Sequence, residues 1–249
     1  MDRRRFLATS GALTGAMVLP YAAMAQGGES HSYATDGGEV VIHPVDHASF
    51  VMETPGLVIY NDPVGEAARY AEYPAPDLIL VTHEHGDHYN VQTLRGIVTD
   101  TTKLIVNPGV FRMLPDDLKA RAMMLSNGDT THAGPYYVAA VPAYNITEDR
   151  LQYHPQGRDN GYVLTVDGLR VYIAGDTENV PEMAHLEEID IAFLPMNLPY
   201  TMDVAQAADA VAMINPRVVY PYHYRGSDID AFTRMVGADA EVRRGDWYS

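Results

Sequence analysis

The sequence predicts an α/β fold on the strength of three observations. Short apolar runs typical of buried strands alternate with segments of helical periodicity, and further strands then repeat as hairpins. A chain of 249 residues that is 47% hydrophobic can bury a sizeable core, so we expect it to be folded rather than disordered. No linker, low-complexity run or heptad pattern interrupts the sequence from residue 38 onward. We therefore expect one folded domain over residues 38–249.

Charge and composition exclude several classes of function. The formal net charge is −16, which argues against a nucleic-acid-binding surface and against docking on anionic membranes, because both need clustered basic residues. The chain has no cysteine, so disulfides and thiolate metal ligands are both excluded. Any metal must be held by nitrogen or oxygen ligands. We expect a small-molecule substrate and no nucleic-acid partner.

The first residues predict a targeting segment. Arg3-Arg4-Arg5-Phe6-Leu7 fits the twin-arginine pattern, and a mildly apolar stretch ends at the small-residue cleavage site Ala23-Met24-Ala25. This predicts a bacterial signal peptide at residues 1–25, a flexible tail at 26–37, and delivery by the twin-arginine machinery to the periplasm or beyond the cell. The alternative is an uncleaved membrane anchor, although the apolar run is short for a spanning helix. We expect no stable anchor after cleavage.

The stretch that organises the chain follows a buried strand predicted at residues 77–81. The six residues His83-Glu84-His85-Gly86-Asp87-His88 contain three imidazoles and two carboxylates. These side chains suit zinc, iron or manganese. They lie in a turn at the carboxyl end of the strand, ahead of a helix that begins near Asn90, and open α/β sheets place their sites at such ends.

Elements before and after this stretch complete the α/β pattern. Strands are predicted at 39–45, 48–53, 57–61, 103–106, 122–126, 136–141, 161–166, 169–174, 190–195, 218–224 and 240–244. Helices are predicted at 91–99, 115–121, 181–189, 203–214 and 228–236. Asn107-Pro108-Gly109 and Asp167-Gly168 are predicted turns, the second of them closing a hairpin.

The pattern His83-x-His85-x-Asp87-His88 resembles the signature of the metallo-β-lactamase superfamily. Asp62 is similar to the first motif of that superfamily, Asp176 in Gly175-Asp176-Thr177 to the fourth, and His223 to the fifth. Four of five motifs thus occur in order, and the resemblance covers nearly the whole chain after residue 25. It implies an αβ/βα four-layer sandwich, in which two mixed sheets face each other and the helices lie outside.

Two further stretches resemble one branch of this superfamily, which contains ascorbate-6-phosphate lactonase and related uncharacterised hydrolases. His47-Ala48-Ser49-Phe50 matches a motif of that branch, except that Asp46 replaces its glycine. His47 is then either a proton donor near the metals or a hydrogen-bonded histidine between strands. Tyr200-Thr201-Met202 matches a loop over the active site, where Tyr200 either polarises a substrate oxygen or forms part of the pocket wall.

The resemblance also implies a set of metal ligands. His83 and His85 would hold one metal with a third ligand, whereas Asp87, His88 and His223 would hold a second. Asp176 would bridge the two, and Asp62 would orient a ligand rather than bind metal. As a structural residue, Asp176 would instead cap a turn.

The third motif departs from the family pattern. Asn145 stands where the family has a metal-binding histidine, and His154 follows nine residues later. Either Asn145 binds weakly through its amide oxygen, or His154 folds back into the site, or the second metal is held loosely. Arg158 and Asn160 lie in the same loop and are candidates for contact with a polar or anionic substrate group.

Together these features predict an exported metal-dependent hydrolase that uses a metal-activated hydroxide on a lactone, a phosphodiester or another ester. Its cofactors would be two divalent metal ions, with zinc preferred and manganese or iron possible. Asp87, His47 and Tyr200 are the catalytic candidates. The alternatives are a mononuclear iron sulfur dioxygenase on the same fold and a metal-binding protein without turnover.

Overall fold

A computed structural model describes residues 31–248. The predicted signal peptide at 1–25 lies outside these residues. The chain forms two seven-stranded sheets, and within each sheet the strands follow one another in sequence order. The first sheet contains β1 His31–Thr35, β2 Gly38–Asp46, β3 Ser49–Glu53, β4 Val58–Asn61, β5 Leu78–Val81, β6 Lys103–Val106 and β7 Ala122–Met124.

The second sheet has the same plan as the first. It contains β8 Thr130–Ala133, β9 Tyr136–Ala143, β10 Asp159–Val166, β11 Leu169–Ile173, β12 Ile191–Pro195, β13 Val218–Tyr222 and β14 Glu241–Val242. In each sheet the first four strands are antiparallel and the last four are parallel. The carboxyl ends of the parallel strands therefore collect at one edge of each sheet.

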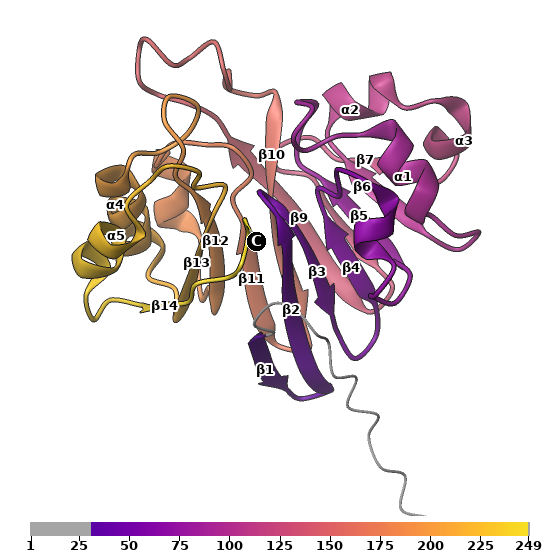
Figure 1. The fold of residues 1–249 in the computed structure, drawn as a ribbon, viewed down its shortest axis with the longest axis horizontal. Coiled ribbons are helices and arrows are strands. Elements are labelled where there is room, and N and C mark those ends of the chain that lie inside the picture. Colours follow the sequence, from indigo (N-terminus) through magenta and orange to yellow (C-terminus); the bar gives the residue numbers. More distant parts are fainter. Residues whose placement is uncertain (1–30, 249) are drawn as a thin grey trace, which may run out of the picture.

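The helices cover the outer faces of the two sheets (Figure 1). On the side of the first sheet lie η1 Ala67–Tyr70, α1 Val91–Ile97, α2 Pro108–Met113 and α3 Asp116–Lys119. On the side of the second sheet lie η2 Pro181–His185, α4 Val204–Ile214 and α5 Ile229–Val236. This arrangement confirms the predicted four-layer sandwich of two facing mixed sheets with helices outside.

Three apolar clusters hold the layers together. The central cluster joins the inner faces of the sheets, where the rings of Phe50 and Phe193 stack with centroids 4.3 Å apart. Trp247 is fully buried in the same cluster, edge-on to both rings. The other two clusters attach the helices to the outer faces of the sheets. Because strand side chains alternate between faces, each central strand serves two of these clusters.

Several local predictions were wrong. Residues 31–35, expected within a loose tail, form β1 and pair with β2 in antiparallel register. The turn predicted at Asn107-Pro108-Gly109 is the start of α2, since the Asn107 side chain accepts a hydrogen bond from the Val110 amide and caps the helix. The helix predicted at 181–189 is a 3₁₀ helix that ends at His185, and Glu188 has a left-handed backbone.

No helix within residues 31–248 is both long enough and apolar enough to cross a membrane.

Candidate metal centre

The candidate site lies where the carboxyl-terminal edges of the two sheets meet. Each of the motifs comes directly after a strand: Asp62 follows β4, the stretch from His83 to His88 follows β5, and His223 follows β13. Two backbone hydrogen bonds join the sheets at this edge, from His223 N to His47 O at 2.9 Å and from Asn160 N to Thr82 O at 3.1 Å. The motifs are therefore brought together by the same edge that closes the sandwich.

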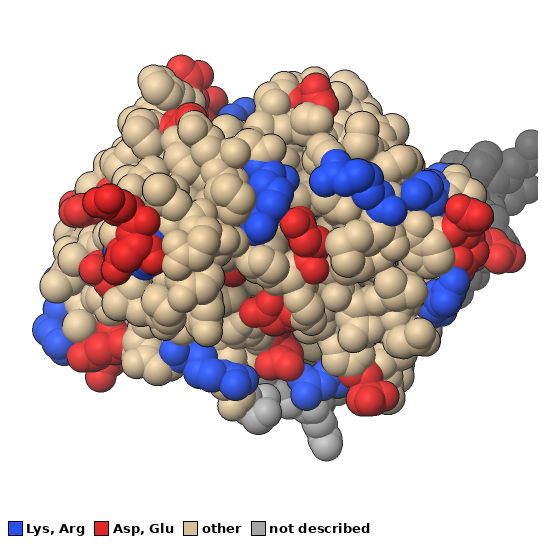
Figure 2. Space-filling model, turned by 90° about the horizontal axis from the view of Figure 1, so that it is seen from above, with Lys and Arg blue, Asp and Glu red and all other residues tan. Residues whose placement is uncertain are grey.

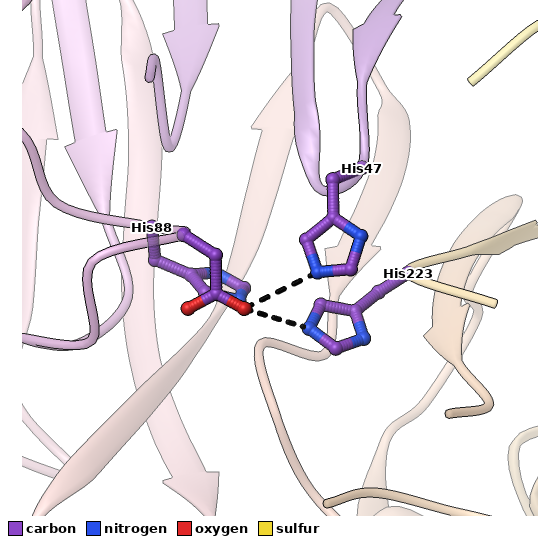
Figure 3. Close-up of side chains that lie close together, drawn as sticks. His47, His88 and His223 are labelled. Atoms are coloured by element: carbon purple, nitrogen blue, oxygen red, sulfur yellow. Dashed lines mark hydrogen bonds and ion pairs between the residues drawn. The ribbon is translucent and has the colours of Figure 1, made fainter. Parts of the chain in front are cut away.

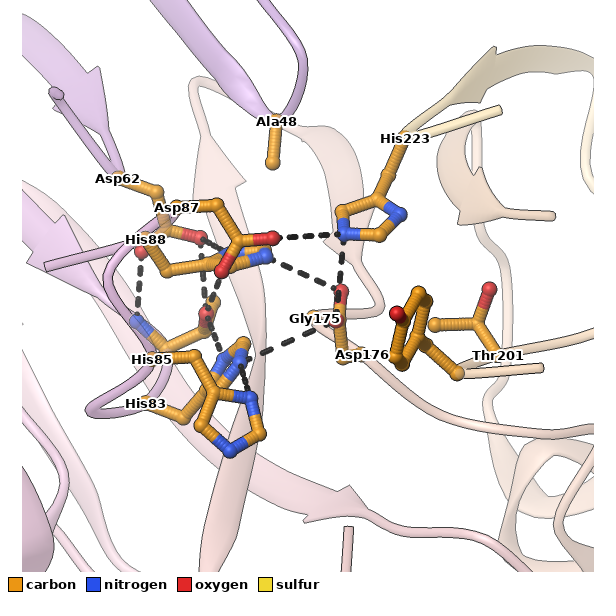
Figure 4. Close-up of polar contacts among 12 residues, drawn as sticks. Ala48, Asp62, His83, His85, Asp87, His88, Gly175, Asp176, Thr201 and His223 are labelled. Atoms are coloured by element: carbon orange, nitrogen blue, oxygen red, sulfur yellow. Dashed lines mark hydrogen bonds and ion pairs between the residues drawn. The ribbon is translucent and has the colours of Figure 1, made fainter. Parts of the chain in front are cut away.

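Imidazoles and carboxylates converge here in three overlapping groups, shown in part in Figure 4. Within each group the nearest ligand-type atoms all lie within 4.8 Å of one another. The groups are His83, His85 and His154; His47, Asp87, His88 and His223; and His83, His88 and Asp176. The sequence motifs predicted most of this gathering, and the structure brings His154 together with His83 and His85.

Asp176 lies between the first two groups. Its Oδ1 is 3.3 Å from His88 Nε2, and its Oδ2 is 3.3 Å from His223 Nε2 and 3.4 Å from His154 Nε2. The preceding Gly175 has φ +67, and a side chain there would meet the carbonyl oxygen of Asn160 at 2.6 Å. Only glycine permits this close approach, which turns the chain so that Asp176 faces both groups.

Two carboxylates orient two of the histidine rings through contacts with Nδ1. Asp62 Oδ2 lies 2.8 Å from His88 Nδ1, and Asp159 Oδ2 lies 2.9 Å from His154 Nδ1. In both rings Nε2 is thereby left to face the site, an arrangement that recurs behind metal-binding histidines. Asp62 is itself fixed by hydrogen bonds from the amide and the hydroxyl of Thr82, each 2.8 Å long. Asp62 thus has the position that its predicted orienting role requires.

The donor set fits a metal centre. Among the described residues, His88 Nε2, His223 Nε2 and Asp176 Oδ1 are buried without a hydrogen-bond partner. Buried polar atoms almost always have a partner, so three such atoms around one point call for a cation between them. Imidazole nitrogen and carboxylate oxygen are suitable ligands for zinc, iron and manganese.

The pKa shifts at the site also indicate that its carboxylates attract positive charge. Burial disfavours the charged form of His88, but the carboxylates of Asp176 and Asp62 outweigh burial and raise the pKa of His88 well above its usual value. Burial is the main cause that lowers the pKa values of His83, His85 and His47. Burial opposes ionisation of Asp176, yet the surrounding histidines, His223 first, hold its pKa well below the usual range. The Asp176 carboxylate is therefore kept ionised, as a carboxylate that binds metal must be.

Backbone strain accompanies these positions. His47, Asp62 and His223 have φ values of +52, +41 and +46, in the left-handed region that residues other than glycine rarely enter. Each such residue costs about 1–2 kcal/mol. The backbone hydrogen bond from His223 N to His47 O holds two of these residues, His47 and His223, in place. Strain of this kind clusters at functional sites.

The loop between β9 and β10 carries His154 into the site. Asn145 does not point its amide nitrogen at the histidines: Nδ2 donates to Tyr200 O at 2.7 Å and to Arg150 O at 3.1 Å, and the Asn145 amide donates to His154 O at 2.8 Å. Asn145 therefore shapes the loop that presents His154, while its amide oxygen Oδ1, the atom predicted as a possible ligand, is buried and has no hydrogen-bond partner among the described residues. The buried Glu178 accepts hydrogen bonds from the amides of Ile146 and Thr147 and fixes the start of the loop.

The two predicted substrate contacts have different surroundings in the structure. Asn160 is fully buried; its amide nitrogen donates to Leu125 O, and its oxygen accepts from Asn127, so the prediction that it meets substrate is wrong. The guanidinium of Arg158 is engaged by Asp159 at 2.7 Å and lies 3.4 Å from Glu84 and from His85 Nε2. Arg158 braces the loop and has its charge matched by carboxylates.

A cavity of about 580 Å³ opens over the site. Its walls include His47, His85, Asp87, His154 and Asp176 from the candidate centre, together with Asp46, Val64, Tyr153, Asn197, Tyr200 and Arg225. Tyr200 is 45% exposed, and its ring lies edge-on to that of Tyr153. Acidic and basic side chains are interspersed over the face of the molecule shown in Figure 2, and much of that face is uncharged.

Sequence reasoning missed three residues around this site. Asp159 orients His154, Arg225 lies on the cavity wall, and Tyr248 OH lies 2.8 Å from His47 Nδ1. Asp159 follows His154 by five residues, and that spacing was the only local signal. Arg225 and Tyr248 belong to no motif, and only the fold brings them to the cavity.

The fold and the site together define a metal-dependent enzyme of the αββα sandwich class. The chain belongs to the family described as "Beta-lactamase superfamily domain", whose model matches residues 41–223. Its relatives in this family include proteins named as metal-dependent hydrolases. A UPF0173 metal-dependent hydrolase of Thermococcus kodakarensis is 32% identical over 210 residues, covering 79% of this chain and 92% of that protein.

Solved structures agree with this assignment. A protein of Parabacteroides distasonis assigned as a metal-dependent hydrolase is 42% identical, with a TM-score of 0.80, covering 87% of this chain and 97% of the other. A metallo hydrolase of Ignicoccus hospitalis is 26% identical, with a TM-score of 0.68, covering 82% and 94%.

Proposed function

We propose that the protein is an exported hydrolase that binds two divalent metal ions and cleaves a lactone, a phosphodiester or another ester with an anionic group. The observation that carries the two-metal assignment is the position of Asp176, with one oxygen toward His88 and the other toward His154 and His223. A carboxylate in this position can bind two cations at once.

The residues divide into two ligand sets. His83, His85 and His154 would hold one ion, Asp87, His88 and His223 the other, and Asp176 both. We propose zinc, with manganese and iron as other metals that this donor set accepts. When bound, the metals supply an activated water and stabilise negative charge on the substrate. Residues 31–248 contain no cysteine, so that part of the chain has no thiol nucleophile.

The substrate's anionic group is inferred from Arg225. This side chain lines the cavity, and its guanidinium lies over the ring of Tyr248, 5.2 Å from the centroid. The other charged wall residue outside the centre, Asp46, is paired with Arg69 at 2.6 Å, whereas Arg225 has no carboxylate partner within residues 31–248 and contacts the ring of Tyr248. Stacking fixes the direction of a guanidinium without consuming its charge. A carboxylate or phosphate on the substrate would provide the missing partner.

Tyr200 is the second candidate for substrate contact. It is exposed on the cavity wall, and its backbone carbonyl accepts a hydrogen bond from Asn145. Its hydroxyl is a donor suited to a carbonyl or phosphoryl oxygen. Figure 4 shows the neighbouring Thr201 on the same side of the site as His223 and Asp176.

The first test is elemental analysis of the mature protein purified without added metal, followed by hydrolysis assays. We expect two ions per chain and turnover of lactones or phosphodiesters that carry an anionic group. Arg225→Gln should raise KM for the anionic substrate about tenfold or more. The KM for a neutral analogue of that substrate should stay unchanged. One iron per chain with persulfide-dependent oxygen uptake would instead support a sulfur dioxygenase, and no bound metal would support a protein without turnover.

A further inference from the structure

His47 belongs by geometry to the group formed with Asp87, His88 and His223, which poses the question of whether it is a metal ligand. Its Nε2 lies 3.3 Å from Asp87 Oδ2, and its ring centroid lies 3.7 Å from that of His223. Figure 3 shows the rings of His47 and His223 side by side, both directed toward His88 and the carboxylate beside it. Distance alone does not distinguish a ligand from a hydrogen-bond donor. The hydrogen-bond donors and acceptors around His47 and Tyr248 do distinguish them.

The hydroxyl of Tyr248 has three polar neighbours. This oxygen accepts hydrogen bonds from the backbone amides of Tyr224 at 3.0 Å and Arg225 at 3.2 Å. It also lies 2.8 Å from His47 Nδ1. Both amides can only donate, so they occupy the acceptor capacity of the oxygen. The one proton of the hydroxyl must then be donated to His47 Nδ1, because a third donor would leave that proton without an acceptor.

We infer that Tyr248 fixes His47 in the tautomer that carries its proton on Nε2, which makes His47 a hydrogen-bond donor to Asp87 and excludes it from the metal ligands. In a neutral imidazole one nitrogen accepts and the other donates, so a proton accepted at Nδ1 requires an N–H at Nε2. A nitrogen that carries a proton has no lone pair for a metal. The inference rests on the proposed metal centre only for the role of Asp87.

The surroundings make this arrangement rigid. The amide of His47 donates to Trp247 O at 3.2 Å, its carbonyl accepts from His223 N, and its φ is +52. Trp247 is fully buried between the sheets. The segment 247–248 thus holds both the backbone and the ring of His47, and Tyr248 is a positioning residue that acts on Asp87 through His47.

The consequence for Asp87 is directional. Its side chain is 51% exposed, so the protein holds it less firmly than the buried ligands. A donated hydrogen bond from Nε2 fixes one oxygen of Asp87 and turns the carboxylate toward His88 and His223. Partners of this kind typically change metal affinity or activity by about 10- to 100-fold when removed.

The direct test is nitrogen-15 NMR of the histidine side chains, recorded on the metal-free and the zinc-loaded protein. We expect His47 to show a protonated Nε2 and an unprotonated Nδ1 in both states. Tyr248→Phe should abolish this preference and lower kcat about 10- to 100-fold at saturating metal. The matched control is Tyr224→Phe, whose ring packs edge-on against Tyr248 but whose hydroxyl has no partner among residues 31–248, and it should change neither readout. A protonated Nδ1 in the wild-type protein, or an unaltered tautomer in Tyr248→Phe, would overturn the inference.

Two substitutions of His47 distinguish donor from ligand. His47→Gln places an amide nitrogen near the position of Nε2 and should retain most of the activity, whereas His47→Asn places it near Nδ1 and should not. Both variants should still bind two cobalt ions with little change in the visible absorption that reports the ligands. Failure of either variant to bind the second cobalt ion even at saturating cobalt would show that His47 is a ligand. If no variant binds metal, the proposed function fails, while the tautomer of the metal-free protein still decides the inference.

Discussion

The residue with the most demanding role is Asp176, because it faces both candidate ligand sets at once. Replacing it by asparagine keeps the shape of the side chain but removes the negative charge that faces the surrounding histidines. We expect Asp176→Asn to lose more activity than the about 10- to 100-fold that follows removal of a residue that only orients ligands. Metal content should fall to one ion or none. Elemental analysis and hydrolysis assays check both, with Asp209→Asn on the exposed side of α4 as control. Full activity with two ions bound would refute the bridging role.

Asp159 acts one step further out, on the ring of His154. Its carboxylate lies 2.9 Å from Nδ1 and also holds the Arg158 guanidinium at 2.7 Å. Asp159→Asn weakens both contacts, and we expect the affinity for the first metal to fall about 10- to 100-fold while the second ion stays bound. Competition with a chelator measures this change. Equal affinities in the variant and the wild-type protein would mean that His154 is not a ligand and would favour the amide oxygen of Asn145 in its place.

At the scale of elements, the sequence predicted the site better where the signal is local. The run from His83 to His88, Asp62 and Asp176 each follow a strand that is visible as an apolar run, so position and chemistry coincide in the sequence. His154 could not be placed in the site from the sequence, because its position depends on a loop held by Glu178 and Asn145. Asn160 was misjudged because a polar side chain beside a loop can be buried once Leu125 and Asn127 satisfy it.

The same limit applies to whole elements. β8, with the sequence Thr-Thr-His-Ala, has no apolar pattern and exists because it pairs with β9. β1 was missed for the same reason, since its residues alternate only between partly buried and exposed. Tertiary pairing decides such strands, and propensity alone does not reveal them.

The loop between β9 and β10 leads to a prediction about stability. Glu178 is fully buried and pairs with Arg150 at 2.9 Å while accepting two backbone amides. Glu178→Ala leaves the two amides without their acceptor and the partly buried Arg150 without its carboxylate, so we expect the free energy of unfolding to fall by about 3–5 kcal/mol. Urea denaturation measures this loss, and trypsin should cleave the variant faster at Arg150. The exposed Glu187→Ala should stay within about 0.5 kcal/mol of the wild-type protein. An intact loop in Glu178→Ala would show that the other contacts suffice.

At the scale of the whole molecule, the two sheets form one closed unit. The central apolar cluster, the hydrogen bonds between the sheets and the candidate metal ligands all span the same interface. A metal that binds both sheets therefore stabilises only the assembled sandwich, because the unfolded chain does not hold the ligands together.

Export remains a prediction from Arg3-Arg4-Arg5-Phe6-Leu7 alone, and it can be tested on the full chain. Replacing Arg3 and Arg4 by lysine keeps the positive charge but removes the arginine pair, so we expect the variant to stay in the cytoplasm as an uncleaved precursor. Arg5→Lys is the matched control, because the pattern tolerates any residue there, and it should be exported normally. Cell fractionation and the mass of the mature protein, expected to begin at Gln26, measure the outcome. Normal periplasmic delivery of the double variant would exclude the twin-arginine route and leave the metals to be acquired after export.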